Sequence, residues 1–259
     1  MDDDFWVDHK QEEFRKMKIA IMSDVHANYP ALIRVLEDIK KEGCHRIYHV
    51  GDSIGIGAYP RECLDLMLGE KIRMIMGNHE YYYLAGDYKF PPGTAKGEID
   101  HQNWVKNLLG EGYRKVVSRF PVVLKETLEG MKIGFMHYVP DPGFKNELHY
   151  KEVKKDLDEG SIDAFFQKED WDLVIFGHQH HPIQDVVGSK TGIRYINPGA
   201  LGCQMGNHAA YSILEINDHQ VTIRHKKVVY DKKTALKALD LRDVPAKEYI
   251  KQIFYCEEQ

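Results

Sequence analysis

Residues 18–80 read KIAIMSDVHANYPALIRVLEDIKKEGCHRIYHVGDSIGIGAYPRECLDLMLGEKIRMIMGNHE, and this stretch decides the fold. Three short apolar runs, KIAIMS, RIYHV and IRMIM, alternate with two segments that have apolar residues at helical spacing. The first helix is expected to start at an Asn28 N-cap with Pro30 in its first turn, and to stop near Gly43; the second starts near Pro60. This strand–helix order predicts a parallel sheet with right-handed crossovers.

The sequence after residue 80 predicts a second sheet. Residues 81–120 are expected to be helical and irregular, with a break at Pro91-Pro92-Gly93. Beyond Pro121 the pattern predicts a hairpin turning at Glu129-Gly130, then mostly antiparallel strands and an outer helix from Lys232 to Leu241. The predicted strands are Val122–Thr127, Met131–Met136, Leu173–Phe176, Ile183–Val187, Ile193–Ile196, Tyr211–Ile216 and Val221–Val229. The simplest interpretation is one α/β domain built from two facing sheets.

Composition limits the class of protein. Residues 17–259 are expected to form a single domain, and residues 1–16 to be an N-terminal extension that is either an extra helix or disordered. The mean hydropathy is -0.48, and no apolar run approaches the roughly 20 residues that span a bilayer. The acidic N-terminus lacks a secretory signal, which predicts a cytoplasmic protein with no membrane partner. The net charge of -5 argues against a stable nucleic-acid complex.

Polar motifs stand where the strands should end. Because side chains at the carboxyl ends of neighbouring strands converge on one crevice, we expect these motifs to form one site. Two Asp, one Asn and five His there can hold two divalent cations, provided that one Asp bridges them. The motifs are Asp24-Val25-His26, Gly51-Asp52, Gly77-Asn78-His79-Glu80, His137 and Gly177-His178-Gln179-His180.

The ligand types indicate the metals. Carboxylate, imidazole and amide ligands without thiolate suit Mn, which we expect here, with Fe, Zn, Co or Ni as alternatives. Two such cations roughly 3.5–4 Å apart can share a hydroxide and clamp a phosphoryl group. Two divalent cations, two aspartates and one hydroxide leave a net charge of about +1, which attracts phosphate even in an acidic protein.

Taken together, these motifs resemble the signature of the calcineurin-like metallophosphoesterases, from residue 18 to about residue 230. The chain is similar in particular to the small prokaryotic branch described as diadenosine tetraphosphatase-like, through GDSIGIGAYPRECLDLM, INPGALG at 196–202 and the strand at Tyr211. The resemblance implies a four-layer αββα sandwich of two facing mixed sheets with a dinuclear metal centre. It also implies hydrolysis of a phosphodiester, nucleotide or dinucleoside polyphosphate through attack by a hydroxide that bridges the metals.

The resemblance assigns a role to each motif residue. His79 would not bind metal but would hydrogen-bond the phosphate or protonate the leaving oxygen, so that it and the bridging Asp52 are the expected catalytic residues. The first metal would be held by Asp24, His26 and His180, and the second by Asn78, His137 and His178.

The sequence departs from the family pattern at two positions. Better-known relatives have an arginine soon after the Gly-Asp motif, whereas here none occurs before Arg61. This puts protein phosphatase and symmetric diadenosine tetraphosphate hydrolase activities in doubt. Bulky Tyr138 follows His137 where a small residue is common, and we expect it to narrow the substrate entrance.

Other functions and weaker site candidates stay open from the sequence. The alternatives to a phosphoesterase are a non-catalytic metal-binding scaffold of the same fold and a nuclease. The expected partner is a small phosphorylated substrate such as a nucleotide, and a homodimer is left open. Among weaker candidates, Tyr81-Tyr82-Tyr83 are expected to pack in the core or on the surface, Asn197-Pro198-Gly199 to shape a turn beside His178, His181 to lie at the rim, and His208 to be within possible reach of the site.

Overall fold

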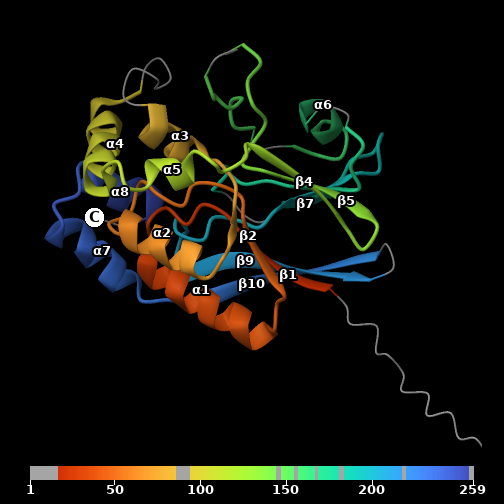
Figure 1. The fold of residues 1–259 in the computed structure, drawn as a ribbon, viewed down its shortest axis with the longest axis horizontal. Coiled ribbons are helices and arrows are strands. Elements are labelled where there is room, and N and C mark those ends of the chain that lie inside the picture. The colour runs from red at the N-terminus through yellow and green to blue at the C-terminus, as the bar shows by residue number, and fades with distance from the viewer. Residues whose placement is uncertain are drawn as a thin grey trace, which may run out of the picture.

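Two five-stranded mixed sheets face each other in the computed structural model of the chain (Figure 1). Helices cover the outer face of each sheet, so the layers run helix, sheet, sheet, helix, which confirms the predicted αββα arrangement. The structure describes residues 17–85, 94–143, 147–154, 157–166, 169–180, 184–217 and 220–256.

The first sheet has the strand order β10-β9-β1-β2-β3. β1, β2 and β3 are parallel, as the βαβαβ pattern predicts, and β9 and β10 add an antiparallel pair beside β1. The bounds are β1 Met17–Met22, β2 Arg46–His49, β3 Arg73–Met74, β9 His208–Asn217 and β10 Gln220–Val229.

The second sheet has the order β4-β5-β6-β8-β7. β5, β6 and β8 are parallel in its centre, and the antiparallel strands β4 and β7 form its edges. The central parallel strands of both sheets therefore end in loops that can meet. The bounds are β4 Val123–Leu128, β5 Met131–Met136, β6 Leu173–Ile175, β7 Gln184–Val187 and β8 Arg194–Asn197.

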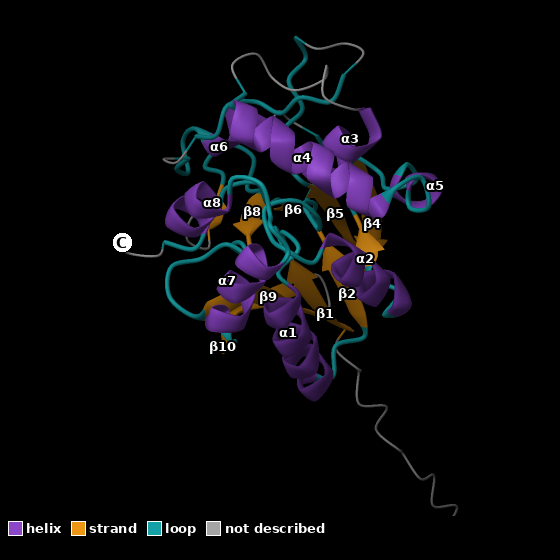
Figure 2. Cartoon of the chain, turned by 90° about the vertical axis from the view of Figure 1, so that its left-hand side faces the viewer, coloured by secondary structure: helices purple, strands orange, loops and turns teal. Residues whose placement is uncertain are grey.

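The helices surround the strand ends, as Figure 2 shows. The first helix forms as the sequence predicts, because the Asn28 side chain accepts a hydrogen bond from the Ala31 N–H and Gly43 closes the helix with a φ of 68°. The bounds are α1 Tyr29–Glu42, α2 Pro60–Gly69, α3 Asn78–Ala85, α4 Lys96–Leu109, α5 Arg114–Val117, α6 Ile162–Phe166, α7 Lys232–Leu241 and α8 Lys247–Phe254.

Strand alternation divides the core into layers. On β1, Ile19 and Ile21 point between the two sheets, whereas Ala20 and Met22 point toward the covering helices. Between the sheets, the rings of Tyr48 and Phe135 stack with centroids 4.2 Å apart and thereby join β2 to β5. The two sheets are thus held in one relative position, which fixes the distance between the loops that leave them.

Some predicted boundaries differ from the structure. The strand expected at Ile72–Met76 is reduced to two residues, because the Met76 N–H donates to the carbonyl of Pro121 rather than to a neighbouring strand. Helix α8 has no counterpart among the predicted elements. The N-terminal extension at 1–16 and the break at Pro91-Pro92-Gly93 lie outside the described residues. Among the described residues, no helix has both the length and the apolar character needed to cross a bilayer.

Candidate metal centre

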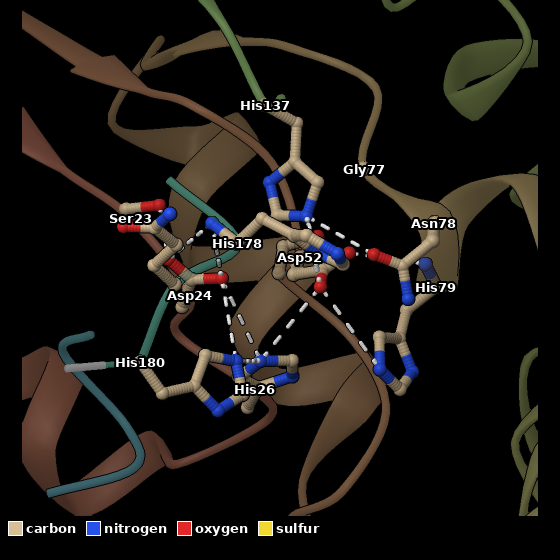
Figure 3. A network of polar contacts seen from close by, with 12 residues as sticks. Ser23, Asp24, His26, Asp52, Gly77, Asn78, His79, His137, His178 and His180 are labelled. Carbon is tan, nitrogen blue, oxygen red and sulfur yellow. Dashed lines mark hydrogen bonds and ion pairs between the residues drawn. The ribbon is translucent and has the colours of Figure 1, made fainter. Parts of the chain in front are cut away.

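The predicted ligands come together at one place between the two sheets (Figure 3). They belong to loops that follow the parallel strands β1, β2, β5 and β6 and to the first turn of α3. Five of the residues follow strands of the first sheet and three follow strands of the second, so the site exists only when both sheets are in place. The eight residues brought together are Asp24, His26, Asp52, Asn78, His79, His137, His178 and His180.

The first group of ligand atoms comes from Asp24, His26, Asp52 and His180, and these atoms all lie within 4.8 Å of one another. His180 Nε2 is 2.8 Å from His26 Nε2 and 3.5 Å from Asp24 Oδ1. His26 Nε2 is 3.8 Å from one oxygen of each aspartate. Two carboxylates and two imidazoles are a suitable donor set for a first-row divalent cation.

The second group comes from Asp52, His137, His178 and Asn78. The Nε2 atom of His137 lies 3.1 Å from Asp52 Oδ2, 3.1 Å from Asn78 Oδ1 and 3.2 Å from His178 Nδ1. Asp52 therefore belongs to both groups, and the same oxygen, Oδ2, faces His137 and His26. This is the arrangement expected if one aspartate bridges two cations.

The second group shows on its own geometry that it fits a cation. His137 Nδ1 lies 2.8 Å from the carbonyl oxygen of Val50, which can only accept a hydrogen bond. Nδ1 therefore carries a proton, and in the neutral imidazole Nε2 keeps a lone pair that can bind a metal. That Nε2 faces the acceptor oxygens of Asp52 and Asn78. A lone pair that points at two further acceptors in a buried site is stabilised by a positive charge among them.

The electrostatics of the cluster lead to the same conclusion. Burial opposes a charge on His137, but the carboxylate of Asp52 raises the pKa of its imidazole to about 9, so a proton on Nε2 competes with a metal cation for the place between these acceptors. Burial would raise the pKa of Asp52, yet the facing His137 and His79 lower it well below the usual value of 3.8. Burial lowers the pKa of His178 to about 3, which keeps it neutral and able to bind metal. The site therefore holds negative carboxylates that attract cations.

His79 lies beside the cluster rather than in either group. Its Nε2 is 4.0 Å from Asp52 Oδ2, and its Nδ1 contacts Gln102 Nε2 of α4 at 2.6 Å. Its backbone N–H donates to Asp52 Oδ1 at 3.0 Å. The side chain thus presents one ring nitrogen toward Asp52 and the other toward α4.

The backbone around the ligands adopts left-handed conformations. Asp24, Asp52 and His178 have φ of 52°, 60° and 67°, which costs free energy in residues other than glycine and is typical of functional sites. Gly51, at φ 97°, leaves room for a ring, because a Cβ there would lie 2.5 Å from His137 Nδ1. Gly55 likewise leaves room for His79, whose Nδ1 would be 2.0 Å from an added Cβ.

Glu80 holds two of these loops together, a role that the sequence analysis did not assign. Its carboxylate is fully buried and accepts hydrogen bonds from the backbone N–H groups of Asp52, Ser53, Ile54 and Gly77, and from the Ser53 hydroxyl. It thereby joins the loop after β2 to the start of α3. The sequence did contain a signal for this role: Glu80 is a carboxylate within the Gly77-Asn78-His79-Glu80 motif to which no metal-binding role was assigned.

Cys203 also lies near the first group. Its sulfur is within 4.8 Å of ligand atoms of His26 and His180. Burial raises the pKa of the thiol well above its ordinary range, so without a cation the sulfur is uncharged. Together with His26 and His180 it forms a further group of possible ligands, which the sequence analysis did not identify.

Tyr138 corrects one expectation. From the sequence, Tyr138 was expected to narrow the substrate entrance, but the side chain is fully buried in the outer core of the second sheet. Its hydroxyl accepts a hydrogen bond from Gln179 Nε2 at 2.9 Å, and its ring packs 5.1 Å from that of His178. The reason is strand alternation: since His137 faces the cluster, its neighbour faces away.

The structure also shows where the described weaker site candidates lie. Asn197 shapes a turn as predicted, accepting from the Gly199 N–H and donating to the carbonyl of Gln179 next to the ligand loop. Tyr83 is buried, and its hydroxyl donates to the carbonyl of Gly110, as expected for core packing. His208 begins β9 and is absent from the described ligand groups. His181 lies outside the described residues.

A cavity of about 430 Å³ opens directly above the cluster. Its inner wall is formed by Asp52, Asn78, His79, His178 and His180. Its outer wall comes from α4, α8 and the residues just before them, among which are Glu98, Gln102, Ala246, Tyr249 and Phe254. The site can therefore admit a small molecule that reaches Asp52 and His79 together.

Known proteins resemble this chain in sequence and in fold. The uncharacterized protein MJ0912 of Methanocaldococcus jannaschii is 29% identical over 255 residues, covering 89% of this chain and 95% of the relative. The fold resembles that of hypothetical protein PH1004 from Pyrococcus horikoshii OT3, with 19% identity, a TM-score of 0.77, and coverage of 93% of this chain and 99% of the other. The fold also resembles that of a metallophosphoesterase from Sphaerobacter thermophilus, with 22% identity, a TM-score of 0.68, and coverage of 91% of this chain and 97% of the other.

The family model for the calcineurin-like phosphoesterase superfamily domain matches residues 17–219. This range includes both sheets up to β9 and all eight residues of the cluster. The sequence motifs, the αββα layers and the convergent ligands agree with that match. The chain therefore belongs to the calcineurin-like phosphoesterase superfamily.

Proposed function

We propose that the chain is a hydrolase that uses two divalent metal ions to cleave a phosphoester. The observation that carries the proposal is the position of Asp52 Oδ2, which is 3.1 Å from His137 Nε2 and 3.8 Å from His26 Nε2. One carboxylate oxygen thus faces a nitrogen ligand of each group. Mn is the expected metal, since the two groups that share Asp52 consist of oxygen and nitrogen donors.

The residues divide into those that would hold the metals and those that would serve the substrate. Asp24, His26 and His180 would hold one cation, and Asn78, His137 and His178 the other, with Asp52 shared. A cation pair supplies Lewis acidity at the phosphoryl oxygens and a water of lowered pKa as nucleophile. His79, which borders the cavity and is outside both groups, is placed to donate a proton to the leaving oxygen.

The intact cluster favours an enzyme over a scaffold. A non-catalytic relative would not need His79 aimed into the cavity or a buried carboxylate, Glu80, bracing the two loops that carry Asp52 and Asn78. A net charge of -5 does not favour a nuclease that grips a long polyanion. We therefore propose small phosphodiesters or nucleotides as the substrate class.

The test combines metal content with activity. Protein treated with a chelator should lose hydrolysis of bis-p-nitrophenyl phosphate and regain it with Mn²⁺, and elemental analysis should find about two metals per chain. Asp52→Asn should bind at least one metal fewer. Two metals retained in Asp52→Asn would sink the shared-ligand assignment. A fully metal-loaded wild type that cleaves no phosphoester in a broad panel would favour the scaffold.

A further inference from the structure

The cavity above the cluster has two walls of different chemistry. The inner wall carries the candidate ligands and His79. The outer wall is built by the start of α4 and by α8, which are held close together: a Cβ added to Gly97 would lie 3.2 Å from the Cβ of Ala246. A molecule whose phosphate is held at the inner wall must therefore place its next group against α4 and α8.

The outer wall offers apolar and aromatic surface. Ile250 and Phe254 line it together with Tyr249, whose side chain remains 59% exposed, and Ile56 adds apolar surface from the loop after β2. The rings of Tyr249 and Phe254 lie 6.2 Å apart at an angle of 78°, and the Phe254 ring is 5.7 Å from that of His180. Phe254 lies next to the candidate ligand His180, and Tyr249 extends the aromatic surface outward. Such a surface can pack against a flat, uncharged ring.

The described part of the same wall offers no cationic side chain for a second phosphate. Among the described residues that line the cavity, none is Lys or Arg, and Glu98 adds a negative charge. Arg61, the first arginine after Asp52, donates instead to the carbonyl of Leu108 on α4. Since polyphosphates are held by cationic groups, a chain of phosphates would meet uncompensated repulsion beyond the cluster.

We propose that this cavity is the leaving-group pocket and that it takes an uncharged aromatic group, such as a nucleobase-bearing or aryl alcohol, attached to a single phosphate. The inference rests on the proposed function, because it places the phosphate at the cluster. It narrows the substrates to phosphoesters with an aromatic group next to the reacting phosphate. It disfavours dinucleoside polyphosphates, whose second phosphate would lie where the wall is apolar or acidic.

The test measures binding, so that it does not depend on turnover. Phenylphosphonate and methylphosphonate carry the same uncleavable phosphonate and differ in the aromatic group. Calorimetry on the Mn-loaded protein should show phenylphosphonate binding about three- to tenfold more tightly than methylphosphonate. Tyr249→Ala should remove most of that preference and leave the affinity for methylphosphonate unchanged.

The control is Ile253→Ala, a change on the same helix. Ile253 is 50% exposed but is not among the residues that line the cavity, so this variant should keep the wild-type preference. Equal affinity of the wild type for the two phosphonates, or a preference that survives Tyr249→Ala, would overturn the pocket assignment. A clear preference without any hydrolysis would leave the pocket standing while refuting the proposed reaction. Faster hydrolysis of diadenosine tetraphosphate than of an aryl monoester or diester would also overturn the pocket assignment.

Discussion

At the scale of single residues, the two ring nitrogens of His79 face different groups. Nδ1 contacts the Gln102 amide at 2.6 Å, and Gly55 packs so closely that no side chain could replace its hydrogen. Nε2 is directed toward Asp52 Oδ2 at 4.0 Å. The ring is thus fixed on one side by α4 and by the loop after β2, and open on the side where a leaving oxygen would lie. This geometry supports the proposal that His79 acts on the substrate and does not bind a metal.

This geometry predicts how His79→Ala will behave. The variant should retain both metals but lose about 100- to 10,000-fold in kcat on an alkyl phosphoester, because the leaving alkoxide then lacks a proton donor. Metal analysis and steady-state kinetics check the two halves of the prediction. p-Nitrophenolate leaves without protonation, so bis-p-nitrophenyl phosphate should show a smaller loss. An equal loss on both substrates would argue against proton donation, and an unchanged rate would refute any catalytic role.

At the scale of elements, α1 is tied to β10 through its last residue, Glu42. The carboxylate lies 2.8 Å from Arg224 and 2.6 Å from Lys226, both on the edge strand β10. Hydrogen bonds from these two side chains lower the pKa of Glu42 from 4.5 to about 2. These two ion pairs hold α1 against the first sheet, and strand β1 of that sheet leads directly to Asp24.

The sign of this pKa shift fixes a pH dependence. A carboxyl with a lowered pKa stabilises the folded protein above its unfolded value of 4.5, and this contribution is lost as the pH falls toward about 2. Glu42→Gln should lower the free energy of unfolding by about 1 kcal/mol at pH 7, measured by urea titration. The difference from wild type should shrink steadily below pH 4.5.

A matched control exists on the same helix. Glu37 pairs with Arg34 one turn away, and both side chains are nearly half exposed, at 47% and 49%. Glu37→Gln should change the stability by less than about 0.5 kcal/mol, because exposed pairs contribute little. If Glu42→Gln matched this small effect at pH 7, or if its effect did not depend on pH, the α1–β10 link would carry no electrostatic stabilisation.

The positions of the strands and helices explain which parts of the site could be predicted from the sequence. Each motif that contributes candidate ligands follows an apolar run, so a local pattern reveals both the strand and the polar residues just beyond its end. The outer wall of the cavity gave no such signal, because Gln102 and Tyr249 come from helices far apart in the chain, and neither lies in a motif. The orientation of Tyr138 could have been derived from His137, since adjacent strand residues face opposite sides.

At the scale of the whole molecule, the candidate metal centre joins two sheets that also meet through the apolar core between them and through polar contacts at their edges, such as the ion pairs of Glu126 on β4 with Arg46 and Arg73 of the first sheet. Asp24 and Asp52 follow strands of the first sheet, whereas His137 and His178 follow strands of the second. The His178 N–H already donates to both oxygens of Asp24 at 3.2 Å, so a backbone contact crosses between the sheets at this point. Cations shared by both sides would add to it and would bind the folded chain in preference to the unfolded one.

Metal removal should therefore lower the melting temperature. At free metal about 100 times the dissociation constant, one bound ion adds about 2.7 kcal/mol, which for a protein of this size corresponds to about 5–10 °C. Scanning calorimetry of wild type with Mn²⁺ and with chelator measures the shift. Asp52→Asn, which cannot share one ligand between two sites, should show a clearly smaller shift. If wild type with two bound metals melted at the same temperature after chelation, the metals would not join the sheets, and apolar packing such as that of Tyr48 on Phe135 would hold them together without metal.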